Sequence, residues 1–262
     1  MAAKTRIVVA GAGGKMGRTL IEAVLADKSL SLAAAFDLKG SPAVGTVVAG
    51  ATVRSDAAAA VRLGEVLIDF TRPEGTLAHL DLCVKLGTAM VIGTTGFDDA
   101  GKARISSASR KIPIVMAPNF AAGVNVVFKL AEQAAEILGD EYDVEIIEAH
   151  HRHKVDAPSG TALMLGEVVA KALRRNLDKV STHGRHGDTG ARPGQQIGFH
   201  AIRGGDIVGE HTVVFAGIGE RVELTVRSQS RMTYAAGALR AVKFLRGRRP
   251  GLYGMREVLG IS

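Results

Sequence analysis

A cluster of glycines near the N-terminus constrains the fold most. It reads Gly-Ala-Gly-Gly-Lys-Met-Gly over residues 11–17, and it lies between a β-branched run at residues 6–10 and apolar residues at helical spacing in residues 18–25. Glycines at a strand-to-helix turn permit a tight turn, close approach of the backbone to a phosphate, and close packing of helix on strand. The N–H groups that open the helix would face that phosphate. The pattern is typical of a dinucleotide-binding unit, and a purely structural turn is the alternative.

The spacing of the glycines and a later acid favour dinucleotide binding over the structural turn. In the dinucleotide-binding fingerprint G-x-G-x-x-G the last glycine would fall at position 16, where this chain has Met16. Gly11, Gly14 and Gly17 form a close variant of that pattern. Asp37 follows about 20 residues after the last of these glycines, at the end of the next predicted strand, where an acid can accept hydrogen bonds from an adenosine ribose.

The choice of cofactor stays open on these residues. Asp37 favours the free 2′-hydroxyl of NADH, whereas Lys39, two residues on, can pair with the 2′-phosphate of NADPH or be a solvated turn lysine. We therefore expect a nicotinamide cofactor, either NADH or NADPH.

Strands and helices alternate along the first part of the chain, which predicts a parallel sheet with helical crossovers. The further predicted strands cover residues 30–36, 66–70, 89–92 and 112–116, and the helices between them cover residues 57–63, 76–86 and 99–109. The pattern changes after about Phe120.

Beyond that point the last three predicted strands follow one another without helices between them, which indicates antiparallel pairing in a second sheet. The predicted elements are helices at residues 124–138 and 161–172 and strands at residues 144–149, 196–202, 210–216 and 221–227, with a loop over 182–195. A last amphipathic helix, 234–246, is expected to return to the first domain. The predicted fold is α/β, with a Rossmann-like parallel sheet domain and a second α+β domain that carries a mixed or antiparallel sheet.

Composition excludes several classes of protein. The net charge is +7, but aromatic residues make up only 4% and there is no tryptophan, so the stacking side chains of a nucleic-acid binder are missing. No apolar run approaches the roughly 18 residues of a membrane span, and no signal-peptide pattern is seen, so we expect a cytoplasmic protein with no membrane partner. The single cysteine, Cys83, sits in an apolar pattern typical of a buried thiol.

A second motif lies at the middle of the chain. Three histidines, an arginine and a lysine occupy residues 150–154, and an anionic ligand would relieve their mutual repulsion. Ser159, Gly160 and Thr161 then open a helix and offer hydroxyl and N–H groups to a carboxylate or phosphate. Histidine also supplies a proton near neutral pH. The alternatives are a solvated charged loop and a metal site, but no cysteine or carboxylate completes a ligand set, so we expect no metal.

The chain resembles the dihydrodipicolinate reductase family over essentially its whole length. The motifs that carry the resemblance are the runs at residues 11–17, 69–75, 93–96, 117–120 and 148–162. The long histidine-rich run is highly specific.

The resemblance implies roles for individual residues of the second motif. His150 matches the catalytic acid/base histidine of the family, and Lys154 matches its proton-donating lysine. His151, Gly160 and Thr161 match substrate contacts, and Lys154 and Ser159 are expected near a substrate carboxylate.

The resemblance also implies the cofactor site. The pyrophosphate loop corresponds to Gly11, Ala12, Gly13, Gly14, Lys15 and Met16, and Asp37 corresponds to the ribose acid. The segments around the nicotinamide correspond to Gly93, Thr94, Thr95, Ala117, Pro118, Asn119 and Phe120. Many members carry an arginine directly after the ribose acid, whereas this chain has Leu38 there, which puts NADPH preference in doubt and leaves Lys39 as the substitute.

The reaction implied is the NAD(P)H-dependent reduction of 4-hydroxy-tetrahydrodipicolinate, a small dicarboxylate, to tetrahydrodipicolinate in diaminopimelate and lysine biosynthesis. Residues 1–121 and 231–262 would form the dinucleotide-binding domain, and residues 122–230 the substrate-binding and oligomerisation domain of a homotetramer. Two alternatives remain: another NAD(P)-dependent reductase of a small anion, such as an amino-acid dehydrogenase, and a redox-sensing module that binds the dinucleotide without turning it over.

Overall fold

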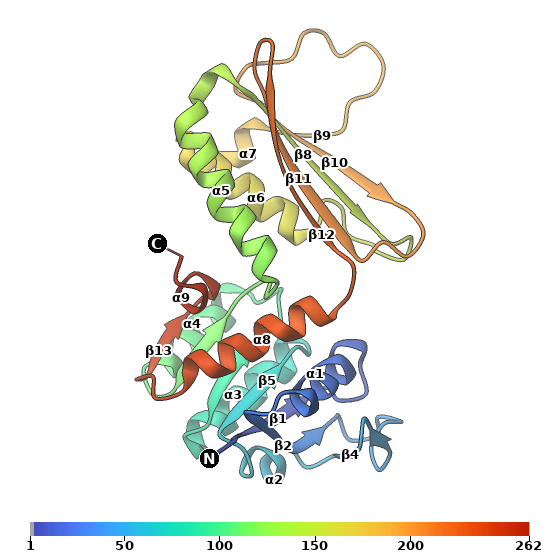
Figure 1. Ribbon diagram of the computed structural model, residues 1–262, viewed down its shortest axis with the longest axis vertical. Coiled ribbons are helices and arrows are strands. Elements are labelled where there is room, and N and C mark those ends of the chain that lie inside the picture. Colours follow the sequence, from blue (N-terminus) through green and yellow to red (C-terminus); the bar gives the residue numbers. More distant parts are fainter. Residues whose placement is uncertain (1–2, 262) are drawn as a thin grey trace. The chain divides into compact units, whose positions relative to one another are not determined.

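The computed structural model describes residues 3–261, and these fold into two compact units (Figure 1). The first unit takes in residues 3–122 and 231–261, and the second is Gly123–Ser230. The predicted domains differ from these units by one residue, Ala122. The roles assigned to the domains stay predictions.

The sheet of the first unit is mainly parallel, with the strand order β13-β7-β6-β5-β1-β2-β4-β3. Its central strands are β1 (Thr5–Ala10), β2 (Leu30–Phe36), β5 (Val66–Asp69), β6 (Ala89–Ile92) and β7 (Pro113–Met116), all parallel. The outer strands are β13 (Gly251–Tyr253), β4 (Ala51–Arg54) and β3 (Val47–Val48), of which only β3 pairs antiparallel.

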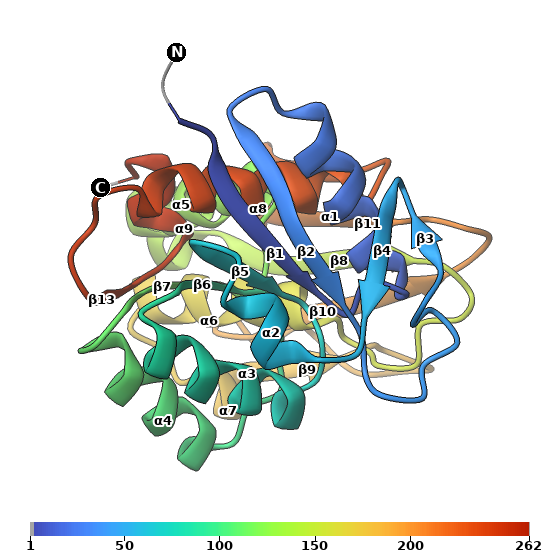
Figure 2. The same cartoon turned by 90° about the horizontal axis from the view of Figure 1, so that it is seen from below.

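Helices cover both faces of this sheet (Figure 2). The first face carries α1 (Lys15–Ala26), α8 (Met232–Leu245) and α9 (Met255–Leu259), and the second carries α2 (Ala57–Val61), α3 (Pro73–Leu86) and α4 (Asp99–Ser109). The residues of β5 and β6 are all buried, which explains why these strands read as apolar runs without alternation. Helix α8 packs against α1, so the prediction that the last long helix returns to the first domain is confirmed.

Cys83 belongs to the second face of this core. Its side chain is fully buried on α3, and burial raises the pKa of its thiol. The thiol is therefore a packing group, as the sequence pattern indicated.

The second unit has one mixed sheet with the order β12-β11-β8-β10-β9. The strands are β8 (Asp143–His150), β9 (Ser181–His183), β10 (Ile197–Arg203), β11 (Gly209–Ala216) and β12 (Arg221–Ser228). The helices are α5 (Ala122–Leu138), α6 (Gly160–Ala172) and the short α7 (Leu177–Val180), and α5 and α6 pack on one face of the sheet (Figure 1). The predicted fold class is thus confirmed.

One detail of the pairing was predicted wrongly. β11 pairs antiparallel with β8 and β12, but β10 pairs parallel with β8. The reason is that α6 lies between β8 and β10 in the chain and provides the crossover that a parallel pair needs.

Candidate functional site

The predicted cofactor residues of the first unit gather at one edge of the parallel sheet. The glycine turn follows β1, Asp37 follows β2, Gly93 follows β6 and Ala117 follows β7. Because these strands are parallel, their carboxyl ends meet at the same edge. The chain order reverses on either side of β1, and in such sheets ligands bind in the crevice at this switch point.

A cleft of about 680 Å³ opens at this edge. Predicted cofactor residues line it together with side chains to which sequence reasoning gave no cofactor role. The predicted ones are Gly11, Gly14, Asp37 and Lys39, and the others include Leu38, Ser55, Arg72 and His79. The cleft therefore brings the glycine turn and the predicted ribose acid to one place.

Close contacts hold the glycine turn against α1. Gly11 has a φ of +66°, and its carbonyl accepts a hydrogen bond of 3.0 Å from the Gly14 N–H. A Cβ on Gly17 would lie 2.1 Å from the Gly11 carbonyl oxygen, so only glycine fits. Helix α1 starts after Gly14 without a side-chain cap, which suits a ligand phosphate at that end.

Asp37 is tied to the same turn. Its Oδ2 accepts the Gly13 N–H at 2.8 Å, and its Oδ1 accepts the Leu38 N–H at 2.7 Å. An ionised carboxylate has about four lone-pair sites, so it can accept further bonds from ribose hydroxyls. The neighbouring Leu38 is 72% exposed, and Lys39 is also exposed.

A buried polar network beneath the cleft was missed by sequence reasoning. Asp69 is fully buried at the end of β5, where Oδ1 accepts the Thr71 N–H at 2.9 Å and Oδ2 lies 2.7 Å from His79 Nδ1. The Thr76 hydroxyl bonds Asp69 Oδ1 and also the hydroxyl of Thr94, at 3.2 and 2.8 Å. The signal available was an Asp-x-Thr turn directly after a buried strand, which is typical of a side-chain-capped turn.

The two predicted nicotinamide segments both pack against Phe70. A Cβ on Gly93 would lie 2.1 Å from the Phe70 ring, and the rings of Phe70 and Phe120 are 5.3 Å apart. Asn119 Oδ1 accepts the Ala121 N–H at 2.9 Å and so fixes the turn after β7. Phe120 is only 1% exposed, so its side chain contributes packing and its contact with a cofactor stays a prediction.

The basic motif of the second unit begins at the last residue of β8. Alternation along β8 places Glu148 and His150 on the face that also carries buried Val144 and Ile146, the face covered by helices. His150 Nδ1 lies 2.6 Å from Glu148 Oε2. Arg203 of β10 forms a bidentate ion pair with the same carboxylate, with both N···O distances at 2.7 Å.

Ser159 links this group to the start of α6. Its hydroxyl oxygen accepts the Ala162 N–H at 3.2 Å and lies 2.9 Å from His211 Nε2, while its own N–H donates to Glu148 Oε1 at 3.1 Å. Gly160 and Thr161 are the first residues of the helix, where the helix dipole favours an anion.

The remaining predicted residues lie in the loop between β8 and α6. Within residues 3–261, His151 Nδ1 is buried and has no hydrogen-bond partner. Lys154 Nζ contacts both carboxylate oxygens of Asp156 at 2.8 Å. Burial opposes ionisation of Asp156, but the hydrogen bond and charge of Lys154, a backbone hydrogen bond and the charge of Arg203 together outweigh it, and the pKa of Asp156 is lowered. Asp156, which is exposed, is thus the acid that holds Lys154 Nζ. A ligand carboxylate could take the place of Asp156.

Burial lowers the pKa of two imidazoles at this site, those of His150 and His211. Burial lowers the pKa of His150, an effect that Glu148 opposes and that Lys154 and Arg203 reinforce. Burial also lowers the pKa of His211 to about 4. At pH 7 the environment of both imidazoles therefore favours the neutral form.

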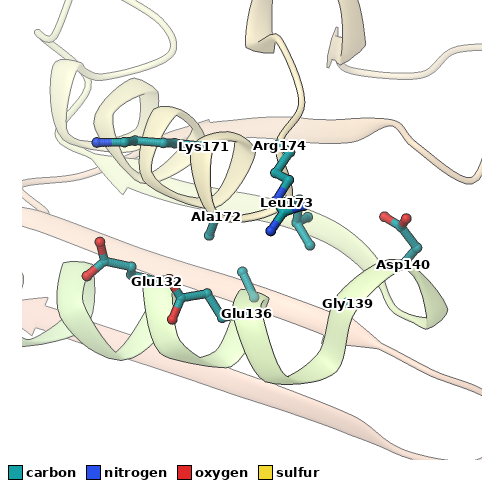
Figure 3. Close-up of a pocket in the computed structure, with 9 residues that line it drawn as sticks. Glu132, Glu136, Gly139, Asp140, Lys171, Ala172, Leu173 and Arg174 are labelled. Carbon is teal, nitrogen blue, oxygen red and sulfur yellow. The ribbon is translucent and has the colours of Figure 1, made fainter.

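A separate groove of about 550 Å³ lies between α5 and α6 (Figure 3). Half-buried Glu132 and the exposed side chains of Glu136, Asp140, Lys171 and Arg174 line it. None of the predicted site residues lies there. Its mixture of charges defines no ligand class.

Two features are absent from the residues that the structure describes. In residues 3–261 no group of three or more His, Cys, Asp or Glu side chains could hold a metal ion. Within the same residues, none of the helices has the length and apolar character that a membrane crossing requires. The cytoplasmic location stays a prediction.

Known proteins match the chain along its length. The family profile described as dihydrodipicolinate reductase, N-terminus, matches residues 5–120, and the C-terminus profile matches residues 123–259. The 4-hydroxy-tetrahydrodipicolinate reductase of Dechloromonas aromatica is 58% identical, and the match covers 98% of both chains. The enzyme of the same name from Thiobacillus denitrificans is 56% identical, over 98% of this chain and 99% of the relative.

A solved structure agrees with these matches. It is described as a dipicolinate-bound dihydrodipicolinate reductase from Paenisporosarcina sp. TG-14, and it is 26% identical with a TM-score of 0.79, over 99% of this chain and 100% of that one. The two profiles together span both units, and the resemblance seen in the sequence motifs is confirmed. The chain belongs to the dihydrodipicolinate reductase family.

Proposed function

We propose that the chain catalyses the NADH- or NADPH-dependent reduction of 4-hydroxy-tetrahydrodipicolinate to tetrahydrodipicolinate, in lysine and diaminopimelate biosynthesis. The observation that carries this proposal is the group of cationic and N–H donors between β8 and α6, beside the imidazole of His150. The relatives of the same family carry this activity in their names, and dipicolinate, which the solved relative binds, is a ring with two carboxylates.

The substrate would bind in the second unit. Its carboxylates would accept hydrogen bonds at the start of α6, from Ser159, Gly160 and Thr161, and ion-pair with Lys154 in place of Asp156. The buried Nδ1 of His151, which has no partner among residues 3–261, supports a ligand contact there.

The glycine turn of the first unit fits a dinucleotide. The missing Cβ atom at Gly17 allows the turn to lie directly on α1, and the uncapped helix start suits a pyrophosphate. When bound there, the nicotinamide would supply the hydride. Asp37 would hold the adenosine ribose, and the segments after β6 and β7 would line the nicotinamide end.

The chain's own residues would supply the proton that the reduced ring needs. Lys154 Nζ is a cation whose side chain is 20% exposed, so it can reach a ligand. His150 would act with it as acid and base through Nε2, because its Nδ1 is engaged by Glu148.

We also propose a homotetramer that forms through the sheet of the second unit. Helices α5 and α6 cover only one face of that sheet. The other face carries Ile147, Val214 and Ile202, the last of which is 52% exposed. Apolar side chains on an open sheet face support an interface between copies.

The decay of NADH and NADPH absorbance tests this function. Dihydrodipicolinate generated by its synthase should cause rapid oxidation of at least one cofactor. Oxidation with a 2-oxo acid and ammonia instead would indicate an amino-acid dehydrogenase. Cofactor binding without any turnover would indicate a redox-sensing module.

Replacing Leu38 with arginine should shift the cofactor preference. Leu38 is largely exposed beside Asp37 and lines the cleft, so arginine costs little packing and can pair with a 2′-phosphate. We expect the ratio of kcat/KM for NADPH to that for NADH to rise about tenfold, the effect of about 1.4 kcal/mol. Leu38→Gln, which adds length without charge, is the control. An unchanged ratio in Leu38→Arg would show that the phosphate is held elsewhere.

A further inference from the structure

The carboxylate of Glu148 accepts hydrogen bonds from three different residues at once. Glu148 is 1% exposed. Its Oε2 lies 2.6 Å from His150 Nδ1 and 2.7 Å from Arg203 Nη1, and its Oε1 lies 2.7 Å from Arg203 Nη2 and 3.1 Å from the Ser159 amide nitrogen. These four bonds use the full accepting capacity of a carboxylate.

Strand register creates this arrangement. Glu148 and His150 are two residues apart on β8 and share a face, while Arg203 stands opposite His150 on β10. His211 stands opposite Glu148 on β11, and its ring lies edge-on to that of His150 at 5.2 Å. The carboxylate is thus held from β10 and from the start of α6, while β11 places His211 beside the His150 ring and the Ser159 hydroxyl.

Stability alone does not account for a buried ion pair at this place. Replacing such a pair by apolar residues of similar size is often neutral or stabilising. The same face of β8 carries Val144 and Ile146, so an apolar residue would be compatible with its surroundings. What the carboxylate adds is orientation, because a carboxylate on Nδ1 fixes the ring and tautomer of a histidine.

Glu148 contacts two parts of the proposed substrate site: the His150 ring, which would transfer a proton, and the start of α6, which would bind a carboxylate. On one side it holds the His150 ring, with the Nδ1–H donated to the carboxylate and Nε2 left for the reaction. On the other it holds the Ser159 N–H, and Ser159 caps the helix that would bind a substrate carboxylate.

We propose that Glu148 is a positioning residue of the reductase, which fixes the His150 ring and the start of α6 relative to each other, and that Arg203 holds Glu148 in place. This inference rests on the proposed function, since it requires His150 to take part in proton transfer.

Glu148→Gln is the direct test. The amide keeps the shape but places a donor against donors, so the His150 ring and the Ser159 amide lose their common anchor. We expect kcat to fall about 10- to 100-fold, the scale seen when partners of functional histidines are removed. The KM for the dicarboxylate should rise while the KM for NADH stays the same.

The pH profile gives a readout that a merely structural role would not move. His150 faces Glu148 on its own strand, Arg203 on β10, His211 on β11 and Lys154 in the following loop, and only Glu148 among these favours its protonated form. The limb of the profile that His150 sets, which is the one lost in His150→Ala, should therefore move to lower pH in Glu148→Gln.

Glu145→Gln is the matched control. Glu145 lies on the same strand but the opposite face, where Arg185, Arg192 and His200 bind its carboxylate. The variant loses a comparable ion pair without touching His150. Because Glu145 lies on the face proposed for the homotetramer, the kcat and pH profile of the variant should match those of the unaltered protein at equal oligomeric state. Melting temperatures of both variants separate loss of fold from loss of positioning.

A second variant covers the case in which Glu148→Gln does not fold. Arg203→Lys keeps the charge but replaces the two-pronged contact with a single point, and it should produce the same changes to a smaller degree. If either folded variant behaves like Glu145→Gln, the positioning role is wrong. If the unaltered protein itself does not oxidise NADH or NADPH with the substrate, the proposed function fails instead.

Discussion

Replacing His150 or Lys154 with alanine is expected to lower turnover at least about 100-fold, with little change in stability. General acid–base groups contribute about 10² to 10⁴ to the rate. Both side chains lie at the end of β8 and in the loop before α6, where their solvent exposure is 12% and 20%. Steady-state kcat with synthase-generated substrate measures the loss.

The neighbouring histidine offers a control for this prediction. His153 is exposed in the same basic loop and lies beside His151 rather than Glu148. His153→Ala should retain kcat within a few-fold. Activity near that of the unaltered protein in both His150→Ala and Lys154→Ala would remove these residues from the mechanism.

Gly17→Ala is expected to weaken cofactor binding at least about tenfold and to lower the free energy of unfolding by about 1–3 kcal/mol, the range for overpacking. The added Cβ would lie 2.1, 2.8 and 2.9 Å from three backbone atoms of Gly11 and Ala12. Backbone cannot rotate away as a side chain can, so the glycine turn would have to move off α1 and lose its shape for a pyrophosphate. The KM for NADH and a denaturation curve measure the two effects.

Gly194→Ala is the comparison for that variant. A Cβ on Gly194 meets no atom within 4 Å, so this change should leave both quantities almost unaltered. If Gly17→Ala binds NADH as well as Gly194→Ala does, the glycine turn is not the pyrophosphate site.

Local patterns in the sequence were enough to predict the first unit. The strand at Thr5–Ala10, the glycine turn and the helix that follows are encoded by neighbouring residues. Strand–helix alternation then implies a parallel sheet, and the carboxyl ends of its strands gather the predicted cofactor residues at one edge. Strands β3, β4, β9 and β13 were missed because two to four residues carry little readable periodicity.

Contacts between distant strands could not be predicted in the same way. Arg203 reaches Glu148 across 55 positions, and His211 reaches Ser159 across 52. Both contacts depend on which strands pair and in which register, and one-residue slips would turn the side chains to the opposite face. The sequence placed His150 and Lys154 together because they are four residues apart, but it did not indicate that the Glu148 carboxylate bonds His150, Arg203 and Ser159 at once.

The sequence motifs predicted both the family and the reductase activity. The matches along the chain confirm both predictions. They rest on a run of fifteen residues, 148–162, whose chemistry is unusual enough to be read without a structure. The preference between NADH and NADPH depends on Leu38 and Lys39. Both side chains are exposed, and no packing fixes their positions, so the preference stays a prediction.

Binding of pyridine-2,6-dicarboxylate, measured by calorimetry, tests the central claim most directly, because this planar ring carries the two carboxylates that the loop between β8 and α6 should hold. We predict that Lys154→Gln weakens binding at least about tenfold, as expected when a charge-assisted contact of roughly 1.5–3 kcal/mol is lost, while Lys39→Gln in the first unit leaves it unchanged. Equal affinity in Lys154→Gln and the unaltered protein, or weaker binding in Lys39→Gln alone, would contradict the account.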